Sequence, residues 1–197
     1  MPNAIFTPTD YFREQALPEI FAAPARPMEI DLGCGDGEFL VGMAAQYPER
    51  NFLGVERLAG RIEKTAKLIR QRGVDNARVL RLESIYTLEW LLPKHCATRL
   101  HLLCPDPWPK KKHEERRLVR MPRFHEALKR VLVPDGEFLL KTDDEPYYND
   151  ALASIGRRAD FTPLDWPDDA FFYPMTGFES QWLALSKSIL RARWRVS

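Results

Sequence analysis

A stiff, charged loop is the part of this chain best equipped for chemistry. Residues 105–109 alternate three prolines with an acid, Asp106, and an aromatic residue, Trp108, and the lysines 110–112 follow at once. Proline fixes φ and keeps the residue before it out of the helical region, so an extended loop is predicted. A carboxylate, a flat ring and a group of cations on one loop suit a planar base with phosphates nearby. The plainer alternative is a proline-rich turn followed by a solvated run of charge.

A glycine-rich turn is the second chemical feature. Residues 31–37 read Asp-Leu-Gly-Cys-Gly-Asp-Gly and follow an apolar run. Glycine lets a ligand approach the backbone, and the helix that follows exposes its first N–H groups. The spacing lacks the third glycine of a dinucleotide fingerprint and the Gly-Lys-Ser/Thr of a P-loop. It resembles the cofactor loop of the Rossmann-like S-adenosylmethionine methyltransferases, whose ligand carries a cationic ammonium group that Asp31 would help hold. An ordinary glycine-rich turn is the alternative.

Acidic residues end five successive predicted strands. Glu56 ends the strand after the glycine turn, where an acid in nucleotide-binding folds accepts hydrogen bonds from ribose hydroxyls. Because ligands of open α/β sheets bind beyond the carboxyl ends of the strands, these acids are predicted to line one edge of the sheet. One such acid is common on a surface, whereas five in succession favour a shared site. The five acids are Asp31, Glu56, Glu83, Asp106 and Asp143.

The elements that must position these residues alternate between strand-like and helix-like patterns. Gly73 fits the position just after a helix that ends at residue 72. The alternation predicts an α/β fold with a doubly wound sheet and helices on both faces. Residues 163–174, rich in prolines and acids, are predicted to form a long loop of the kind that is often functional. Strands are predicted at 28–32, 51–56, 77–82, 100–104, 136–142 and 182–190, and helices at 38–46, 59–72, 123–132 and 147–157.

The composition is that of a single globular domain, predicted to span residues 1–197 with 1–25 as an N-terminal extension. The chain is 45% apolar and 29% charged with a net charge of +1, so nucleic-acid binding needs a local basic patch. Cysteines at 34, 96 and 104 and the four histidines lack the spacing of disulfide frameworks or metal sites, which predicts no metal. No signal peptide or membrane span is evident, which predicts a reducing cytoplasm.

Three segments together resemble the bacterial tRNA (guanine-N7-)-methyltransferase family. The first is the Asp-Pro-Trp-Pro-Lys run at 106–110, followed by Arg-Arg-Leu at 116–118. The second is Thr142-Asp143 with Tyr147, and the third is the Thr-Gly-Phe-Glu run at 176–179. They occur in the family's order, and the resemblance covers roughly residues 29–183. It implies the class I methyltransferase fold, a Rossmann-like, mostly parallel sheet of seven strands.

The resemblance also implies an activity, a cofactor and partners. The expected reaction is transfer of a methyl group from S-adenosyl-L-methionine to N7 of a guanine in tRNA, at tRNA position 46. A monomer and a homodimer both fit, and no membrane is involved. The alternatives are a paralogue of the same fold that acts on another RNA or on a small molecule, and a non-catalytic RNA-binding relative.

Site residues follow from the same resemblance. Asp106 is the expected catalytic residue. The cofactor contacts are expected from Asp31, Gly33, Gly35, Gly37, Glu56, Glu83 and Asp106. The substrate contacts are expected from Lys110, Asp143, Thr176, Gly177, Phe178 and Glu179. The chain departs from the family pattern at Glu83, where Asp is usual, at Glu114 and Glu115 in a normally basic stretch, at 180–182, where a basic residue is common, and at its short N-terminus.

The chemistry requires little of the protein beyond position and charge. Guanine N7 has an exposed lone pair and no proton, so it attacks a sulfonium methyl group without a strong base. The methylated ring becomes positive, and Asp106 or Asp143 near its edge would stabilise that charge and accept hydrogen bonds from the guanine N1–H and amino group. Trp108 is either a stacking surface for the base or a buried anchor.

Basic residues around the proline-rich loop are predicted to bind phosphates, and the basic end of the chain is predicted to be a frayed, solvated terminus. The predicted phosphate-binding patch is Lys110, Lys111, Lys112, Arg116, Arg117, Arg120 and Arg123. The predicted frayed terminus holds Arg191, Arg193, Trp194 and Arg195.

Overall fold

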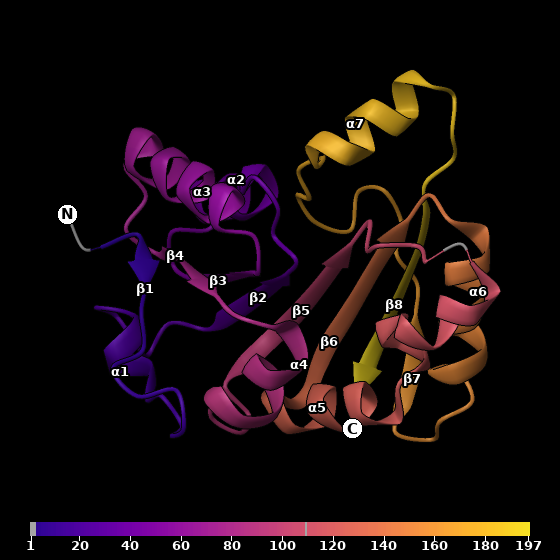
Figure 1. Cartoon of the computed structure of the whole chain (residues 1–197), viewed down its shortest axis with the longest axis horizontal. Helices are drawn as coiled ribbons and strands as arrows, with labels where there is room; N and C mark the ends of the chain where they lie inside the picture. Colours follow the sequence, from indigo (N-terminus) through magenta and orange to yellow (C-terminus); the bar gives the residue numbers. More distant parts are fainter. Residues whose placement is uncertain (1–2, 109) are drawn as a thin grey trace.

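The computed structural model describes residues 3–108 and 110–197, so Pro109 of the proline-rich loop and residues 1–2 of the predicted domain lie outside it. The described chain forms a sheet of eight strands in the order β1-β4-β3-β2-β5-β6-β8-β7 (Figure 1). All neighbours are parallel except β8, which runs antiparallel to β6 and β7. The strands are β1 (Ile5–Phe6), β2 (Met28–Leu32), β3 (Asn51–Glu56), β4 (Ala77–Arg81), β5 (Ala97–Leu103), β6 (Leu132–Thr142), β7 (Phe161–Leu164) and β8 (Leu190–Val196).

Helices cover both faces of the sheet, as predicted. Helices α2 and α3 pack against one face of the β2–β4 half, and α5 and α6 pack against the opposite face of the sheet, mainly at β6 and β8 (Figure 1). The helices are α1 (Leu17–Ile20), α2 (Glu38–Gln46), α3 (Ala59–Arg72), α4 (Ser84–Tyr86), α5 (Pro122–Val131), α6 (Glu145–Ser154) and α7 (Gly177–Ala184). A π-helical turn (Thr87–Leu91) and two 3-10 turns (Lys111–Arg116 and Leu118–Arg120) complete the described structure.

The central strands and helices follow directly from the apolar pattern. In β3, Phe52 faces the core under α2 and α3, whereas Leu53 and Val55 face the core on the opposite side. Ile62 and Ile69 of α3 are buried at helical spacing, and Gly73 ends that helix with φ 66°, as predicted. The predicted bounds of β2, α2, β3 and α3 are confirmed, and the other correctly predicted elements differ by a few residues at their ends.

The predicted strand at 182–190 is wrong, since the chain there completes α7 and then turns before β8. Thr176 caps α7, because its Oγ1 accepts a hydrogen bond from the N–H of Glu179 at 2.9 Å. A Thr three residues before a Glu is a known helix-start pattern. The capping hydrogen bond therefore favours a helix here, although the apolar content of the segment favours a strand.

The basic C-terminus is an ordered strand, so the prediction of a frayed end is also wrong. Trp194 is 1% exposed and stacks on Phe138 of β6, with ring centroids 5.6 Å apart. Arg193 pairs with Glu137 of the same neighbouring strand. Residues 190–196 alternate apolar and basic side chains, which is the period of a strand with one face on a core.

The sheet has eight strands within the described residues rather than the predicted seven. The additional strand is β1, which lies in the predicted extension 1–25 and pairs in parallel with β4. Ile20 and Phe21 of the same segment are buried in the core. The predicted loop 163–174 begins inside β7 and then crosses the sheet face beside β6 and β8, where Tyr173 lies over Lys141.

Candidate functional site

A cavity of about 700 Å³ opens at the carboxyl ends of β2 to β6, the edge at which the acids were predicted to gather. Its walls come from the glycine turn, the ends of β3 and β4, the proline-rich loop after β5, and α7. The five strand-end acids all line it: Asp31, Glu56, Glu83, Asp106 and Asp143. The prediction that these acids line one edge of the sheet is confirmed by this placement, and their contacts with a ligand stay a prediction.

The glycine turn is held in shape by the neighbouring strand and helix. The N–H groups of Gly33 and Cys34 donate to the carbonyl of Val55 at 2.8 and 3.1 Å, and Thr65 of α3 donates to the carbonyl of Gly35 at 3.0 Å. Gly37 has φ 86°, and a Cβ there would stand 2.5 Å from the Thr65 methyl group. A side chain at this position would therefore push α3 away from the turn.

Asp31 is a buried acid with an oxygen that nothing satisfies. It is 4% exposed, and its Oδ2 has no hydrogen-bond partner among the described residues. Burial, reinforced by the charge of Glu56, raises the pKa of Asp31 to about 8. Since an unpaired buried carboxylate is costly, the arrangement calls for a cationic partner at the cavity wall.

Glu56 and Glu83 present one oxygen each to the cavity side while the backbone holds the other. Oε1 of Glu56 accepts from the N–H groups of Arg57 and Leu58 at 2.7 and 2.9 Å, and Oε2 lies 3.8 Å from Nη1 of Arg61. Oε2 of Glu83 accepts from the N–H of Tyr86 and so caps α4 at 2.7 Å. Each fixed carboxylate retains acceptor capacity for hydroxyl or amino hydrogens.

A buried arginine on the side of α6 holds the proline-rich loop in place. Arg117 is 4% exposed, donates to the carbonyl of Pro107 at 2.8 Å, and pairs with Asp150 of α6 at 2.6 Å. Asp106 is exposed on the cavity wall. Trp108 is half-buried, with the guanidinium of Arg116 5.0 Å from its ring centre. The Trp108 ring therefore lines the cavity and is not fully buried in the core.

The predicted phosphate-binding patch is smaller in the structure than in the sequence. Lys110 to Lys112 and Arg116 are exposed, whereas Arg117 is buried, which corrects its assignment to the patch. Arg120 pairs with Glu114 at 2.7 Å, and Arg123 pairs with Glu89 at 2.6 Å. Glu114, one of the acids that interrupt this stretch, therefore pairs with one of its cations, and Glu89 from outside the stretch pairs with another.

The α7 segment closes the cavity from the side opposite the proline-rich loop. Asp143 at the end of β6 pairs with Lys187 beyond α7 at 3.2 Å. Thr176, Gly177 and Phe178 line the cavity, and the guanidinium of Arg61 lies 5.4 Å from the Phe178 ring. Lys110 does not line the cavity, and its predicted substrate contact stays a prediction.

Glu179 connects α7 to the sheet instead of lining the cavity. Its Oε1 accepts from Lys141 of β6 at 2.7 Å, and both side chains are at most 10% exposed. Its Oε2 is buried without a partner among the described residues, and the predicted contact of Glu179 with the substrate stays a prediction.

Replacing Glu179 by alanine is expected to destabilise the protein by about 3 to 5 kcal/mol, because Lys141 would be left as a buried, uncompensated charge. Thermal unfolding and protease cleavage between residues 177 and 189 measure the loss. The matched control removes both charges with Glu179→Leu and Lys141→Met, and most of the stability should return. A single substitution that costs less than about 1 kcal/mol would contradict an anchoring role.

Among the residues that line the cavity and that sequence reasoning missed are Arg61 and Trp182. Arg61 lies in the first turn of α3, where the helix dipole disfavours a cation. A cation at such an unfavourable position is the sequence signal that could have identified Arg61 as a functional residue. Trp182 lay in the segment taken for a strand. Among the described residues, no group of three or more His, Cys, Asp or Glu lies close enough to hold a metal ion.

Comparisons with known proteins agree with this architecture. A family described as "Putative methyltransferase" matches residues 25–192. The tRNA (guanine-N(7)-)-methyltransferase of Syntrophotalea carbinolica is 33% identical over 187 residues, which covers 91% of this chain and 80% of the relative. The protein of the same description from Leifsonia xyli is 35% identical over 174 residues, covering 86% and 76%.

Solved structures match at the level of fold. The 16S rRNA methyltransferase KamB has a TM-score of 0.64 at 18% identity, with all of both chains covered. The aminoglycoside resistance methyltransferase NpmB1 has a TM-score of 0.58 at 19% identity, with 89% of both chains covered.

Proposed function

From its membership of the tRNA (guanine-N7-)-methyltransferase family, we propose that this chain transfers a methyl group from S-adenosylmethionine to N7 of a guanine in tRNA. The observation that carries the proposal is the single cavity lined at one end by Asp31 and Glu56 and at the other by Asp106, Trp108 and α7. The expected target position 46 rests on the resemblance of the motifs.

The residues at the glycine turn fit the cofactor. The unpartnered Oδ2 of Asp31 would hold its ammonium group, and the free oxygen of Glu56 would accept hydrogen bonds from the ribose hydroxyls. Glu83, which also lines the cavity, would contact the adenine amino group. The backbone of Gly33 and Gly35 has no side chain to block the approach of the ligand.

The residues at the other end of the cavity fit a guanine. When bound, S-adenosylmethionine supplies a methyl group on a positively charged sulfur, which guanine N7 takes as the carbon–sulfur bond breaks. Asp106 would stabilise the positive charge that develops on the ring and would accept from N1–H and the amino group. Trp108 offers a face for stacking, and a base within folded RNA must turn out of its stack to reach it.

Cofactor binding is expected to depend on pH through Asp31. The pKa of about 8 means that the free protein holds this carboxyl protonated at pH 7, whereas the ammonium group requires the carboxylate. Affinity should therefore rise about tenfold for each pH unit between pH 5.5 and 7.5, with release of about 0.9 proton at pH 7. Calorimetry in two buffers of different ionisation enthalpy measures the proton release, and a flat affinity over this range would contradict the assignment.

The proposal is tested by offering labelled S-adenosylmethionine with three acceptors in turn. These are tRNA that lacks N7-methylguanine, ribosomal RNA, and a small-molecule extract. Transfer to tRNA alone is the expected result. Transfer to either of the others supports a paralogue, and cofactor binding without any transfer supports a non-catalytic relative.

The residues described here include no helix long and apolar enough to span a membrane. We propose a cytoplasmic location for the protein and a single methyltransferase domain over the whole chain, both on the basis of the family. A monomer and a homodimer both fit the proposed reaction.

A further inference from the structure

Helix α3 concentrates positive charge in a chain that is otherwise balanced. Its fourteen residues include five cations and one acid, Glu63, while the whole chain has 29 basic and 28 acidic residues. One of the cations, Arg61, lies in the first turn of the helix, where the helix dipole disfavours positive charge. A cation at a position that the helix dipole disfavours indicates that its side chain contacts a group outside the helix.

Two further arginines extend this charge to the ends of β3 and β4. Arg81 is exposed at the end of β4, and its Nε donates to the carbonyl of Arg57 at 3.4 Å. Arg57 follows β3 directly and is exposed. We call Arg57, Arg61, Lys64 and Arg81 the α3 rim.

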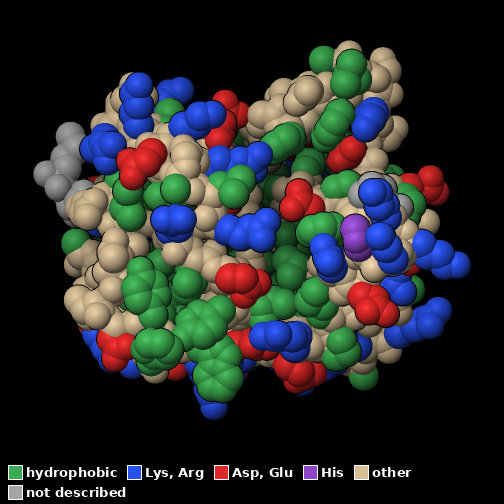
Figure 2. Space-filling model, in the orientation of Figure 1, with side chains coloured by type: hydrophobic (Ala, Val, Ile, Leu, Met, Phe, Trp, Pro, Cys, Tyr) green, Lys and Arg blue, Asp and Glu red, His purple; other side chains and the backbone are tan. Residues whose placement is uncertain are grey.

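The α3 rim borders the cavity on the side away from the proline-rich loop. Arg57 after β3 and Arg61 of α3 line the cavity on this side, whereas Trp108 and Arg116 line it on the side of the proline-rich loop. Figure 2 shows Lys and Arg side chains gathered over α3 on one side of the hollow and over the segment 110–120 on the other. A nucleotide turned into the cavity has phosphates on both sides, so its strand must pass over both groups of cations.

The cations of the α3 rim can bind phosphate, because none of them is held by a strong ion pair with a carboxylate of the described residues. Arg57 and Arg81 have no carboxylate within 4 Å among the described residues. Lys64 pairs with Asp36 at 3.1 Å, but both side chains are at least half exposed, and such pairs are weak. Arg61 lies 3.8 Å from Glu56, beyond hydrogen-bond reach.

We propose that the α3 rim is a second phosphate-binding surface, which holds the RNA backbone flanking the methylated guanosine on the side opposite Lys110 to Lys112. This inference rests on the proposed function, since it takes RNA as the substrate. It explains how a chain of net charge +1 attracts RNA although Arg117 is buried and Arg120 and Arg123 are paired with acids.

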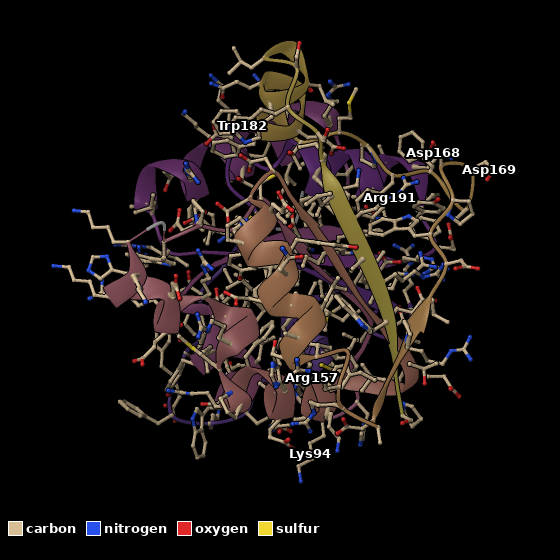
Figure 3. The ribbon with its side chains drawn as sticks, turned by 90° about the vertical axis from the view of Figure 1, so that its right-hand side faces the viewer. Lys94, Arg157, Asp168, Asp169, Trp182 and Arg191 are labelled. Carbon is tan, nitrogen blue, oxygen red and sulfur yellow. The ribbon has the colours of Figure 1, made fainter. Side chains whose placement is uncertain are left out.

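The test removes two rim charges that lie outside the cavity lining. Lys64→Ala with Arg81→Ala should weaken binding of tRNA about tenfold at 0.1 M salt and reduce the slope of log affinity against log salt by about 1.4 to 1.8. The matched control is Lys94→Ala with Arg157→Ala, which removes the same charge from exposed positions at the other end of the molecule from Trp182 (Figure 3). The control should keep the wild-type slope and affinity within about twofold.

Two results would overturn the proposal. An unchanged salt slope in the rim variant means that no phosphate is bound there, and equal losses in both variants mean that only total charge matters. Affinity for S-adenosylmethionine, measured alongside, should stay within about threefold of wild type and shows that the fold and the cofactor end are intact. If the wild type binds tRNA but transfers no methyl group, the proposed function fails while the slopes still decide the role of the rim.

Discussion

Asp106→Ala is expected to lower the single-turnover rate of methyl transfer at least about a hundredfold while the protein remains folded. Asp106 is exposed on the cavity wall, so its removal leaves no buried group unsatisfied, and the melting temperature should change by no more than about 2 °C. The rate falls because the positive charge that develops on the guanine ring loses its nearest counter-charge. Asp143 cannot fully replace it, since its carboxylate pairs with Lys187.

Two further variants separate charge from bulk at this position. Asp106→Asn keeps the size and one acceptor oxygen but loses the charge, so a rate close to that of Asp106→Ala would identify charge as the main contribution. Asp169→Ala, an exposed acid that points away from the molecule, serves as the control and should retain the full rate (Figure 3). Turnover of Asp106→Ala within a few-fold of wild type would refute a catalytic role.

Asp31→Asn is expected to abolish measurable binding of S-adenosylmethionine and, at the same time, to raise the melting temperature by about 3 to 10 °C at pH 8. The folded protein raises the pKa of Asp31 to about 8, above the value of about 3.9 in an unfolded chain. Such a group destabilises the fold progressively as pH rises from about 4 to about 8, because the unfolded chain releases its proton first. The amide carries no charge and removes this cost.

The stability gain should nearly vanish at pH 3, where both the folded and the unfolded state hold the proton, so a pair of melting curves at pH 3 and pH 8 checks the sign. Asp36→Asn is the matched control for stability, since this acid lies in the same turn but is half exposed and pairs with Lys64. Its melting temperature should stay within about 2 °C of wild type. A destabilised Asp31→Asn at pH 8 would show that the carboxylate already has a partner in the free protein.

The first half of the fold was predictable because each element there satisfies local and tertiary preferences together. In β3 and α3 the apolar period, the closing Gly73 and the buried faces all agree. In the second half of the chain, different local sequence signals favour different secondary structures. The segment 176–184 is apolar enough for a strand, but Thr176 and Glu179 begin a helix, and the strand that follows is built from alternating arginines that suggested a solvated tail.

Some features of the candidate site could also be predicted from the sequence, and others could not. The strand-end acids could be placed together because parallel strands bring their carboxyl ends to one edge. The role of Glu179 could not be predicted, because its partner Lys141 comes from a strand that only the folded sheet brings near. Arg117 was taken for a surface cation, since the sequence does not reveal that Pro107 and Asp150 enclose it.

The most direct test of the central claim is the nucleoside composition of tRNA after incubation with this protein and S-adenosylmethionine. The starting tRNA lacks N7-methylguanine, and the product is digested to nucleosides and separated by chromatography with mass detection. The account predicts N7-methylguanosine as the new nucleoside, in an amount close to one per tRNA, and at least about a hundredfold slower formation with Asp106→Ala. A methyl group on another base or another atom of guanine, or none at all while cofactor binding is intact, would contradict it.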